Sequence, residues 1–132
     1  MNNASAPQLR IARPSRDLEA ATRFYTQAFG LQVLAMFADH AGIDGIILGH
    51  PGWPYHLEFT RRRTNPVEPR PTDEDLLVFY LPERLRRDAV VQRVRALGAR
   101  VVPSANPYWD ERGFTFGDPD GYRIVIENAG WP

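Results

Sequence analysis

The segment HLEFT, residues 56–60, places a histidine and a glutamate two positions apart in an apolar, aromatic-rich run. If this run is a strand, side chains two apart point to the same face of the sheet. His56 and Glu58 would then stand side by side, as two metal ligands or the two halves of an acid/base pair do. The chemistry open to them depends on what the rest of the chain brings to that face.

Composition removes several classes of chemistry. The chain has 132 residues and no cysteine, which excludes disulfides, zinc–thiolate sites and thiol catalysis. Basic and acidic residues both number 16, so nothing attracts nucleic acid over long range. The start, MNNASAPQLRIARP, has no apolar core of signal-peptide length, and no segment is long enough to span a membrane. We therefore expect a cytoplasmic protein with neither a nucleic-acid nor a membrane partner.

The order of predicted elements repeats along the chain. Helical spacing of apolar residues predicts helices at 15–30 and 83–97, with Ser15 or Asp17 as the first cap and Gly30 and Gly98 just past the two ends. Strands are predicted before and after each helix, at 9–13, 31–37, 43–48, 54–60, 76–81, 100–103, 113–116 and 122–128.

This repeat predicts an α+β fold made of two βαβββ modules that pack together. We place module one at 8–61, module two at 75–130, and a polar, proline-rich linker at 62–74 between them. The whole of 1–132 is then a single domain, a size that supports its own core.

Three segments carry a resemblance to a known family: RDLEAATRFYTQAFGLQVL in module one, and RVRALGARVV and DPDGYRIVIEN in module two. Doubled modules of this kind resemble the vicinal oxygen chelate superfamily, which includes glyoxalase I, the bleomycin-resistance proteins and the extradiol dioxygenases. The resemblance implies mixed or antiparallel curved sheets that form a cup-like cavity, with the helices outside. It also implies a small-molecule ligand and a homodimer.

Metal-using members of the superfamily take four ligands, usually two histidines and two glutamates, from the first and last strands of each module. Carried over by position, these places hold Arg10, Glu58, Leu76 and Val125, so only Glu58 matches. Arginine has no lone pair to offer a metal, and leucine and valine do not ligate. We therefore expect no metal and no other cofactor.

A rebuilt divalent-metal site remains an alternative. His56 shares a face with Glu58, and Glu127 lies one same-face step beyond position 125, so His56, Glu58 and Glu127 could supply three ligands. The competing hypothesis is that the guanidinium of Arg10 replaces the charge of the metal and pairs with Glu58, because a buried carboxylate needs a partner. Arg10 could instead bind a ligand carboxylate or phosphate.

Further residues are candidates for ligand contact. Counting in twos places Val78, Tyr80, Arg123 and Glu127 on the cavity face of module two. The segment SANPYWDERG, residues 104–113, reads as a loop with aromatic rings beside charges, and its candidates are Tyr108, Trp109 and Arg112. Packing alone is the competing interpretation for all of these rings.

Three functions remain open at this stage. The first is a metal-independent protein with a small-molecule cavity that binds a metabolite or drug. The second is an enzyme, a glyoxalase-like lyase or isomerase rather than a dioxygenase, with Glu58, His56 and Arg10 as the catalytic residues. The third is an interaction module without a cavity. No nucleophile elbow, phosphate loop or dinucleotide motif favours any other class.

Overall fold

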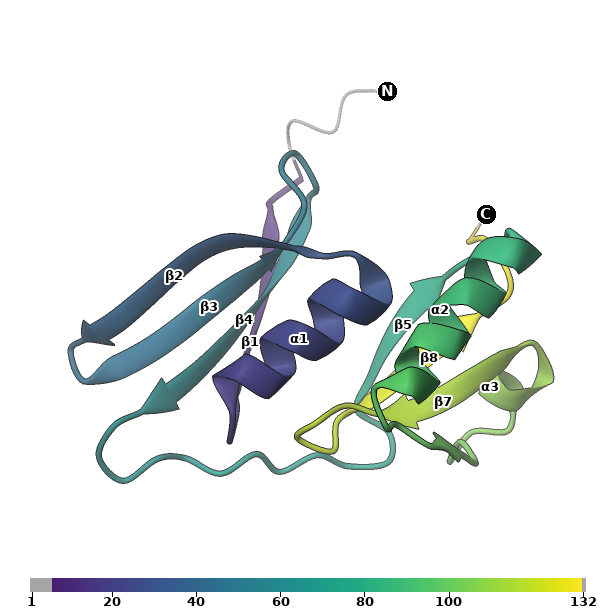
Figure 1. Ribbon diagram of the computed structural model, residues 1–132. Helices are drawn as coiled ribbons and strands as arrows, with labels where there is room; N and C mark the ends of the chain where they lie inside the picture. Colours follow the sequence, from purple (N-terminus) through teal and green to yellow (C-terminus); the bar gives the residue numbers. More distant parts are fainter. Residues whose placement is uncertain (1–5, 132) are drawn as a thin grey trace.

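Two four-stranded sheets, each covered on one face by a long helix, make up the protein (Figure 1). The computed structural model describes residues 6–131. Residues 1–5 and 132, at the two ends of the predicted domain, lie outside the described residues. The first five residues of the segment MNNASAPQLRIARP are therefore not described.

The first module contains one helix and four strands. The elements are β1 (Leu9–Pro14), α1 (Leu18–Phe29), β2 (Gln32–His40), β3 (Ile43–Gly49) and β4 (Tyr55–Arg62). The strand order in the sheet is β1-β4-β3-β2, in which β1 runs parallel to β4 and the other pairs are antiparallel.

The second module repeats this plan with one addition. Its elements are β5 (Leu76–Tyr80), α2 (Arg84–Ala96), β6 (Val101–Val102), α3 (Tyr108–Glu111), β7 (Gly113–Gly117) and β8 (Arg123–Glu127). The strand order is β5-β8-β7-β6, with β5 parallel to β8. The α+β fold of paired βαβββ modules predicted from the sequence is confirmed.

Local chemistry explains the ends of α1. The carboxylate of Asp17 accepts a hydrogen bond from the amide of Ala20 at 3.1 Å, so Asp17 caps the first turn. Gly30 adopts a left-handed conformation, with φ of 70°, and its amide donates to the carbonyl of Thr26. Both positions agree with the sequence prediction.

Two elements differ from the prediction. Strand β2 continues to His40 rather than ending at position 37, because its last residues pair with the start of β3 through an irregular register. The segment predicted as a loop contains the one-turn helix α3, which begins after Pro107, where the side chain of Asn106 accepts a hydrogen bond from the amide of Tyr108 at 3.1 Å.

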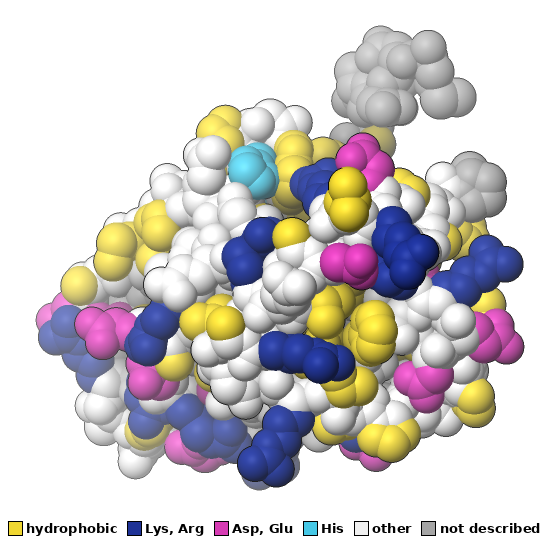
Figure 2. Space-filling model, turned by 45° about the vertical axis from the view of Figure 1, so that its right-hand side comes forward, with side chains coloured by type: hydrophobic (Ala, Val, Ile, Leu, Met, Phe, Trp, Pro, Cys, Tyr) yellow, Lys and Arg dark blue, Asp and Glu magenta, His cyan; other side chains and the backbone are white. Residues whose placement is uncertain are grey.

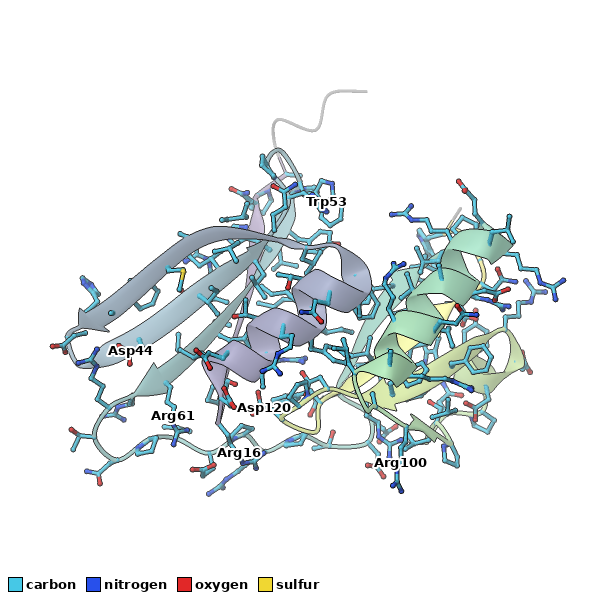
Figure 3. The ribbon with its side chains drawn as sticks, in the orientation of Figure 1. Arg16, Asp44, Trp53, Arg61, Arg100 and Asp120 are labelled. Carbon is cyan, nitrogen blue, oxygen red and sulfur yellow. The ribbon has the colours of Figure 1, made fainter. Side chains whose placement is uncertain are left out.

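The two modules contact each other through their helices and one turn. The ring of Phe29 in α1 stacks on Phe79 in β5, with centroids 4.3 Å apart. The buried hydroxyl of Tyr25 donates to Asp118, in the turn before β8, at 2.7 Å. The amide of Arg16 donates to Asp120 in the same turn at 2.8 Å, and Figure 3 shows these two side chains together where the modules meet. These contacts fix α1 against the second module.

Candidate functional site

The pairing of β1 with β4 collects polar side chains on one face of the first sheet. Arg10 lies beside His56, and Ala12 lies beside Glu58. The alternate residues, such as Leu57 and Phe59, point to the opposite face and enter the core with α1. Arg10, His56 and Glu58 therefore share the face that the helix leaves free.

Arg10 connects the other two residues of this group. Its Nε donates to Nε2 of His56 at 2.9 Å, and its Nη1 lies 3.5 Å from Oε2 of Glu58. The side chain of Arg10 is 46% exposed and that of Glu58 is 16% exposed, so the guanidinium borders solvent above a mostly covered carboxylate. Nε2 of His56 is thus the acceptor, and its lone pair faces the N–H of Arg10.

The hypothesis of an Arg10–Glu58 pair missed the shorter contact. The hypothesis paired Arg10 with Glu58 because both stand at metal-ligand positions of the superfamily. In the parallel pairing of β1 with β4, however, the neighbour of Arg10 is His56, two residues before Glu58. A partner's register is a tertiary property, so no signal within either strand reports it.

Gly49 makes room for His56. It lies opposite His56 in the pairing of β3 with β4. A Cβ atom at position 49 would stand 3.0 Å from Cβ of His56 and 3.3 Å from Cδ1 of Leu34. Glycine therefore allows the imidazole to lie close over β3, within reach of Arg10.

These side chains do not fit the metal that the fold family implies. Arg10 donates its N–H to Nε2 of His56, so the lone pair of that atom is not free for a metal. The positive group beside Glu58 is thus the guanidinium. Within residues 6–131, no cluster of three or more histidine, aspartate or glutamate side chains could hold an ion, so His56, Glu58 and Glu127 do not form one group in a single chain.

The predicted face of the second module has a different character. Val78 and Tyr80 in β5 pair with Val125 and Glu127 in β8. Tyr80 is 38% exposed, whereas Val125 is fully buried and Glu127 is 3% exposed. Burial raises the pKa of the Glu127 carboxyl, an effect that nearby Arg112 opposes and Glu111 reinforces.

The loop at 103–112 lies beside the second sheet. Thr115 and Val125 are both fully buried although they lie outside the core that packs on α2. The amide of Asn128, just after β8, donates to the carbonyl of Arg112 at 2.7 Å, so the end of the loop lies beside the end of β8. Figure 1 shows α3 beside β7. Sequence reasoning identified the loop but not that it lies beside the strands.

The remaining predicted ligand contacts fall into two groups. Arg123 donates to the carbonyl of Pro103 at 2.9 Å and pairs with Asp73 at 3.1 Å, so it ties the loop and the linker to β8. Tyr108 is 57% exposed and its ring meets Trp109 edge-on, with centroids 4.9 Å apart. Tyr108 and Arg112 border a pocket with Tyr80 and Glu127.

A second hollow lies between the modules. This cleft of about 930 Å³ extends from Trp53, in the turn between β3 and β4, and Tyr55, at the start of β4, to the whole of β5 and to Arg86 and Arg93 on α2. Its walls are mainly aliphatic and aromatic. Trp53 packs against the imidazole of His50, with ring centroids 4.2 Å apart, and Figure 3 places it at the tip of the first module.

Charge is distributed over the surface rather than gathered. In Figure 2, basic and acidic side chains alternate over the visible face, with hydrophobic groups between them. Among residues 6–131, no helix combines the length and apolar character needed to cross a membrane.

Comparison with known proteins agrees with this architecture. A YycE protein of Bacillus subtilis (strain 168) is 41% identical over 124 residues, which is 94% of this chain and 89% of the relative. A crystal structure of a YycE protein of unknown function from Bacillus subtilis superposes with a TM-score of 0.90 at 39% identity, over 100% of this chain and 96% of the other.

More distant structures share the fold. The trypanothione-dependent glyoxalase I of Leishmania major gives a TM-score of 0.73 at 20% identity, over 94% of this chain and 87% of that one. TnmS3, an antibiotic-binding protein of Streptomyces sp. CB03234, gives 0.62 at 23% identity, over 98% and 100%. The fold is that of the vicinal oxygen chelate superfamily.

Two family models locate the chain within that superfamily. The YycE-like N-terminal domain matches residues 9–60, and the YycE-like C-terminal domain matches residues 74–128. The chain therefore belongs to the YycE-like family.

Proposed function

We propose that the protein binds a small metabolite or drug in a metal-independent site built around Arg10. The observation that carries the proposal is the position of its guanidinium, which contacts His56 and Glu58 while remaining half exposed. His56 accepts from Nε and Glu58 is nearest to Nη1, so the remaining N–H groups of the planar fork are free for a ligand carboxylate or phosphate.

A homodimer completes the proposed site. Strands β1 and β5 each stand at the edge of a sheet, with one side unpaired in the part of the chain that the structure describes. Leu9 in β1 is 56% exposed. A second copy would cover these edges and the apolar cleft between them, and would set the Arg10 face against a second-module face carrying Val78 and Tyr80.

Ligand titration tests the binding proposal. In ¹H–¹⁵N NMR spectra, a panel of small carboxylates and phosphates is expected to shift the amides around Arg10. The Arg10→Ala variant should lose these shifts, and the matched Arg95→Ala variant, altered on the exposed surface of α2, should retain them. Equal shifts in all three proteins would contradict the proposal.

Subunit mixing tests whether two chains share the site. Light scattering should give twice the mass of the 15.0 kDa chain. If each site uses Arg10 from one copy and Tyr80 from the other, Arg10→Ala and Tyr80→Ala proteins each bind weakly, but refolding them together restores roughly a quarter of the wild-type sites in heterodimers. No restoration would mean that each chain binds alone.

An isomerase or lyase is the second candidate, favoured by the position of Glu58 beside Arg10. Glu58 would take a proton from a carbon next to a carbonyl, the electron pair would move to the carbonyl oxygen, and the N–H groups of Arg10 would stabilise that oxygen. In a 2-hydroxy carbonyl substrate, the hydroxyl proton would move to the enolate oxygen, and Glu58 would return the first proton to the former carbonyl carbon, so that the old hydroxyl becomes the new carbonyl. Deuterium exchange into 2-oxo and 2-hydroxy carbonyl compounds, absent in Glu58→Gln, would support this function. If the rate of deuterium exchange with the protein equals the rate in buffer without it, the isomerase or lyase candidate fails and only the binding function remains.

A further inference from the structure

A small pocket in the second module combines aromatic rings with carboxylates. It has a volume of about 340 Å³ and lies where β5, β8 and α3 approach the end of the chain. The side chains that define it are Tyr80, Tyr108, Glu111, Arg112, Glu127 and Trp131.

The three rings present free surface to the pocket. Tyr80, Tyr108 and Trp131 are 38%, 57% and 78% exposed, so none is enclosed in the core. The rings of Tyr80 and Trp131 have centroids 6.3 Å apart and are inclined by 52°, so they form a tilted pair rather than a face-to-face stack. Ring faces carry partial negative charge and attract a cation within about 6 Å of the centroid.

Glu127 forms the floor of the pocket. It is 3% exposed, and its Oε1 has no hydrogen-bond partner among the described residues. Gly113 lies opposite it, and a Cβ there would stand 3.1 Å from Oε1, so the missing side chain keeps space beside this oxygen. A buried acceptor without a donor costs stability unless a ligand supplies the donor.

Two charged side chains and one phenol surround Glu127. Glu111 on α3 and Arg112 just after it carry opposite charges, and Tyr80 on β5 adds a phenol. Two carboxylates against one guanidinium leave the pocket negative when Glu127 is ionised. Arg112 is exposed and Glu127 is buried, so solvent screens the charge of Arg112 more strongly than that of Glu127.

We propose that this pocket binds a small organic cation, a substituted ammonium group held by the rings of Tyr80, Tyr108 and Trp131 and by the carboxylate of Glu127. The inference rests on the proposed small-molecule function and adds the ligand class at the second module. Every residue that lines the pocket comes from one chain; Tyr80 also belongs to the proposed dimer site but Arg10 does not line the pocket, so we expect cation binding there without Arg10.

Titration with choline and its uncharged isostere, 3,3-dimethylbutan-1-ol, tests the proposal. The two molecules have nearly the same shape and differ in charge. Chemical shifts of the Trp131 indole should report choline binding at least tenfold tighter than that of the isostere. Equal affinity would overturn the proposal, because it would mean that the pocket selects only apolar shape.

Opposite effects of two charge changes provide a sharper criterion. Glu127→Gln should weaken choline binding roughly tenfold, and Arg112→Gln should strengthen it severalfold, because each removes a charge of opposite sign. Glu74→Gln, which changes an exposed linker residue, is the control and should have no effect. A weakening by Arg112→Gln, together with acetate binding, would assign the pocket to anions and contradict the proposal.

A variant outside the core guards against folding artefacts. Trp131→Ala alters an exposed ring, so it should abolish choline binding without changing the thermal unfolding temperature. Choline affinity should also fall as the pH drops through the pKa of Glu127, and this fall should be smaller in Glu127→Gln. Retention of choline binding in Arg10→Ala separates this pocket from the Arg10 site, so either proposal can fail while the other stands.

Discussion

Nε of Arg10 donates a hydrogen bond to Nε2 of His56 at 2.9 Å, across the parallel pairing of β1 with β4. In metal-using proteins of this superfamily, that face holds a cation bound by histidine and glutamate. Here a cation is present as part of the chain, and it occupies the lone pair through which the imidazole would bind a metal. Arg10, His56 and Glu58 thus form a charge-paired group on this face.

Arg10→His should create a metal-binding site beside His56 and Glu58. The change removes the guanidinium and supplies a second imidazole next to His56 and Glu58, which gives three ligands on one face. We expect Ni²⁺ or Zn²⁺ binding with a one-to-one stoichiometry by isothermal titration calorimetry. Arg10→Ala is the control: it frees the same space with only two ligands and should bind far more weakly. Equal binding by both variants would contradict the role given to position 10.

Gly49→Ala should disturb His56 and destabilise the fold. The new Cβ would stand 3.0 Å from Cβ of His56, so the strands must separate slightly or the imidazole must shift. Such overpacking costs about 1–2 kcal/mol in the free energy of unfolding. Gly117→Ala in β7 is the matched control, because nothing lies within 4 Å of the added atom. Urea denaturation measures the loss of stability, and the NMR signals of the His56 imidazole report its displacement. Unchanged imidazole signals would argue against a contact between position 49 and His56.

Tyr25→Phe should weaken the connection between the modules. The lost hydroxyl donates to Asp118 at 2.7 Å in a buried site, where the same carboxylate also accepts from the amides of Asp120 and Tyr122. We expect a loss of about 2 kcal/mol in unfolding free energy, as for hydrogen bonds to charged groups. Tyr108→Phe alters an exposed hydroxyl and should change stability by less than about 0.5 kcal/mol. Equal losses of stability in Tyr25→Phe and Tyr108→Phe would refute the stabilising role given to the Tyr25–Asp118 hydrogen bond.

Stability should depend on pH through Glu127. Its folded-state pKa is raised by burial, so the ionised carboxylate destabilises the fold above that pKa, and the destabilisation vanishes as the pH falls below the unfolded-state value. Glu127→Gln resembles the protonated form. We expect the variant to be about 1 kcal/mol more stable at neutral pH and equal to the wild type in acid. Thermal unfolding of both proteins from neutral to acidic pH tests this expectation. If the stability advantage of Glu127→Gln over the wild type grew as the pH fell, the expectation would be contradicted.

The parts of the fold that local chemistry determines could be predicted from the sequence. The Asp17 cap, the glycine after α1 and the doubled order of elements depend on residues close together in the chain. The Arg10–His56 contact depends on the register between strands 46 positions apart, which no local pattern records. The same holds for α3, because a single turn of four residues is too short for helix propensity to predict it.

The residues of the candidate site illustrate the same division. Face sharing by His56 and Glu58 follows from strand periodicity, and the structure places both on the face opposite α1. Burial of Val125 and Glu127 does not follow, because it depends on which segments of the folded chain lie against the second sheet. Residue types within a strand give its two faces, but they do not report which segment covers each face.

The most direct test of the account is the metal content of protein purified without chelator, followed by titration with zinc, nickel, manganese and iron(II). We predict no stoichiometric metal in the wild type and none in Glu58→Gln, since Arg10 supplies the cation of this face. One ion per chain in the wild type that is lost in Glu58→Gln would contradict the account and would show that His56 and Glu58 ligate a metal despite Arg10.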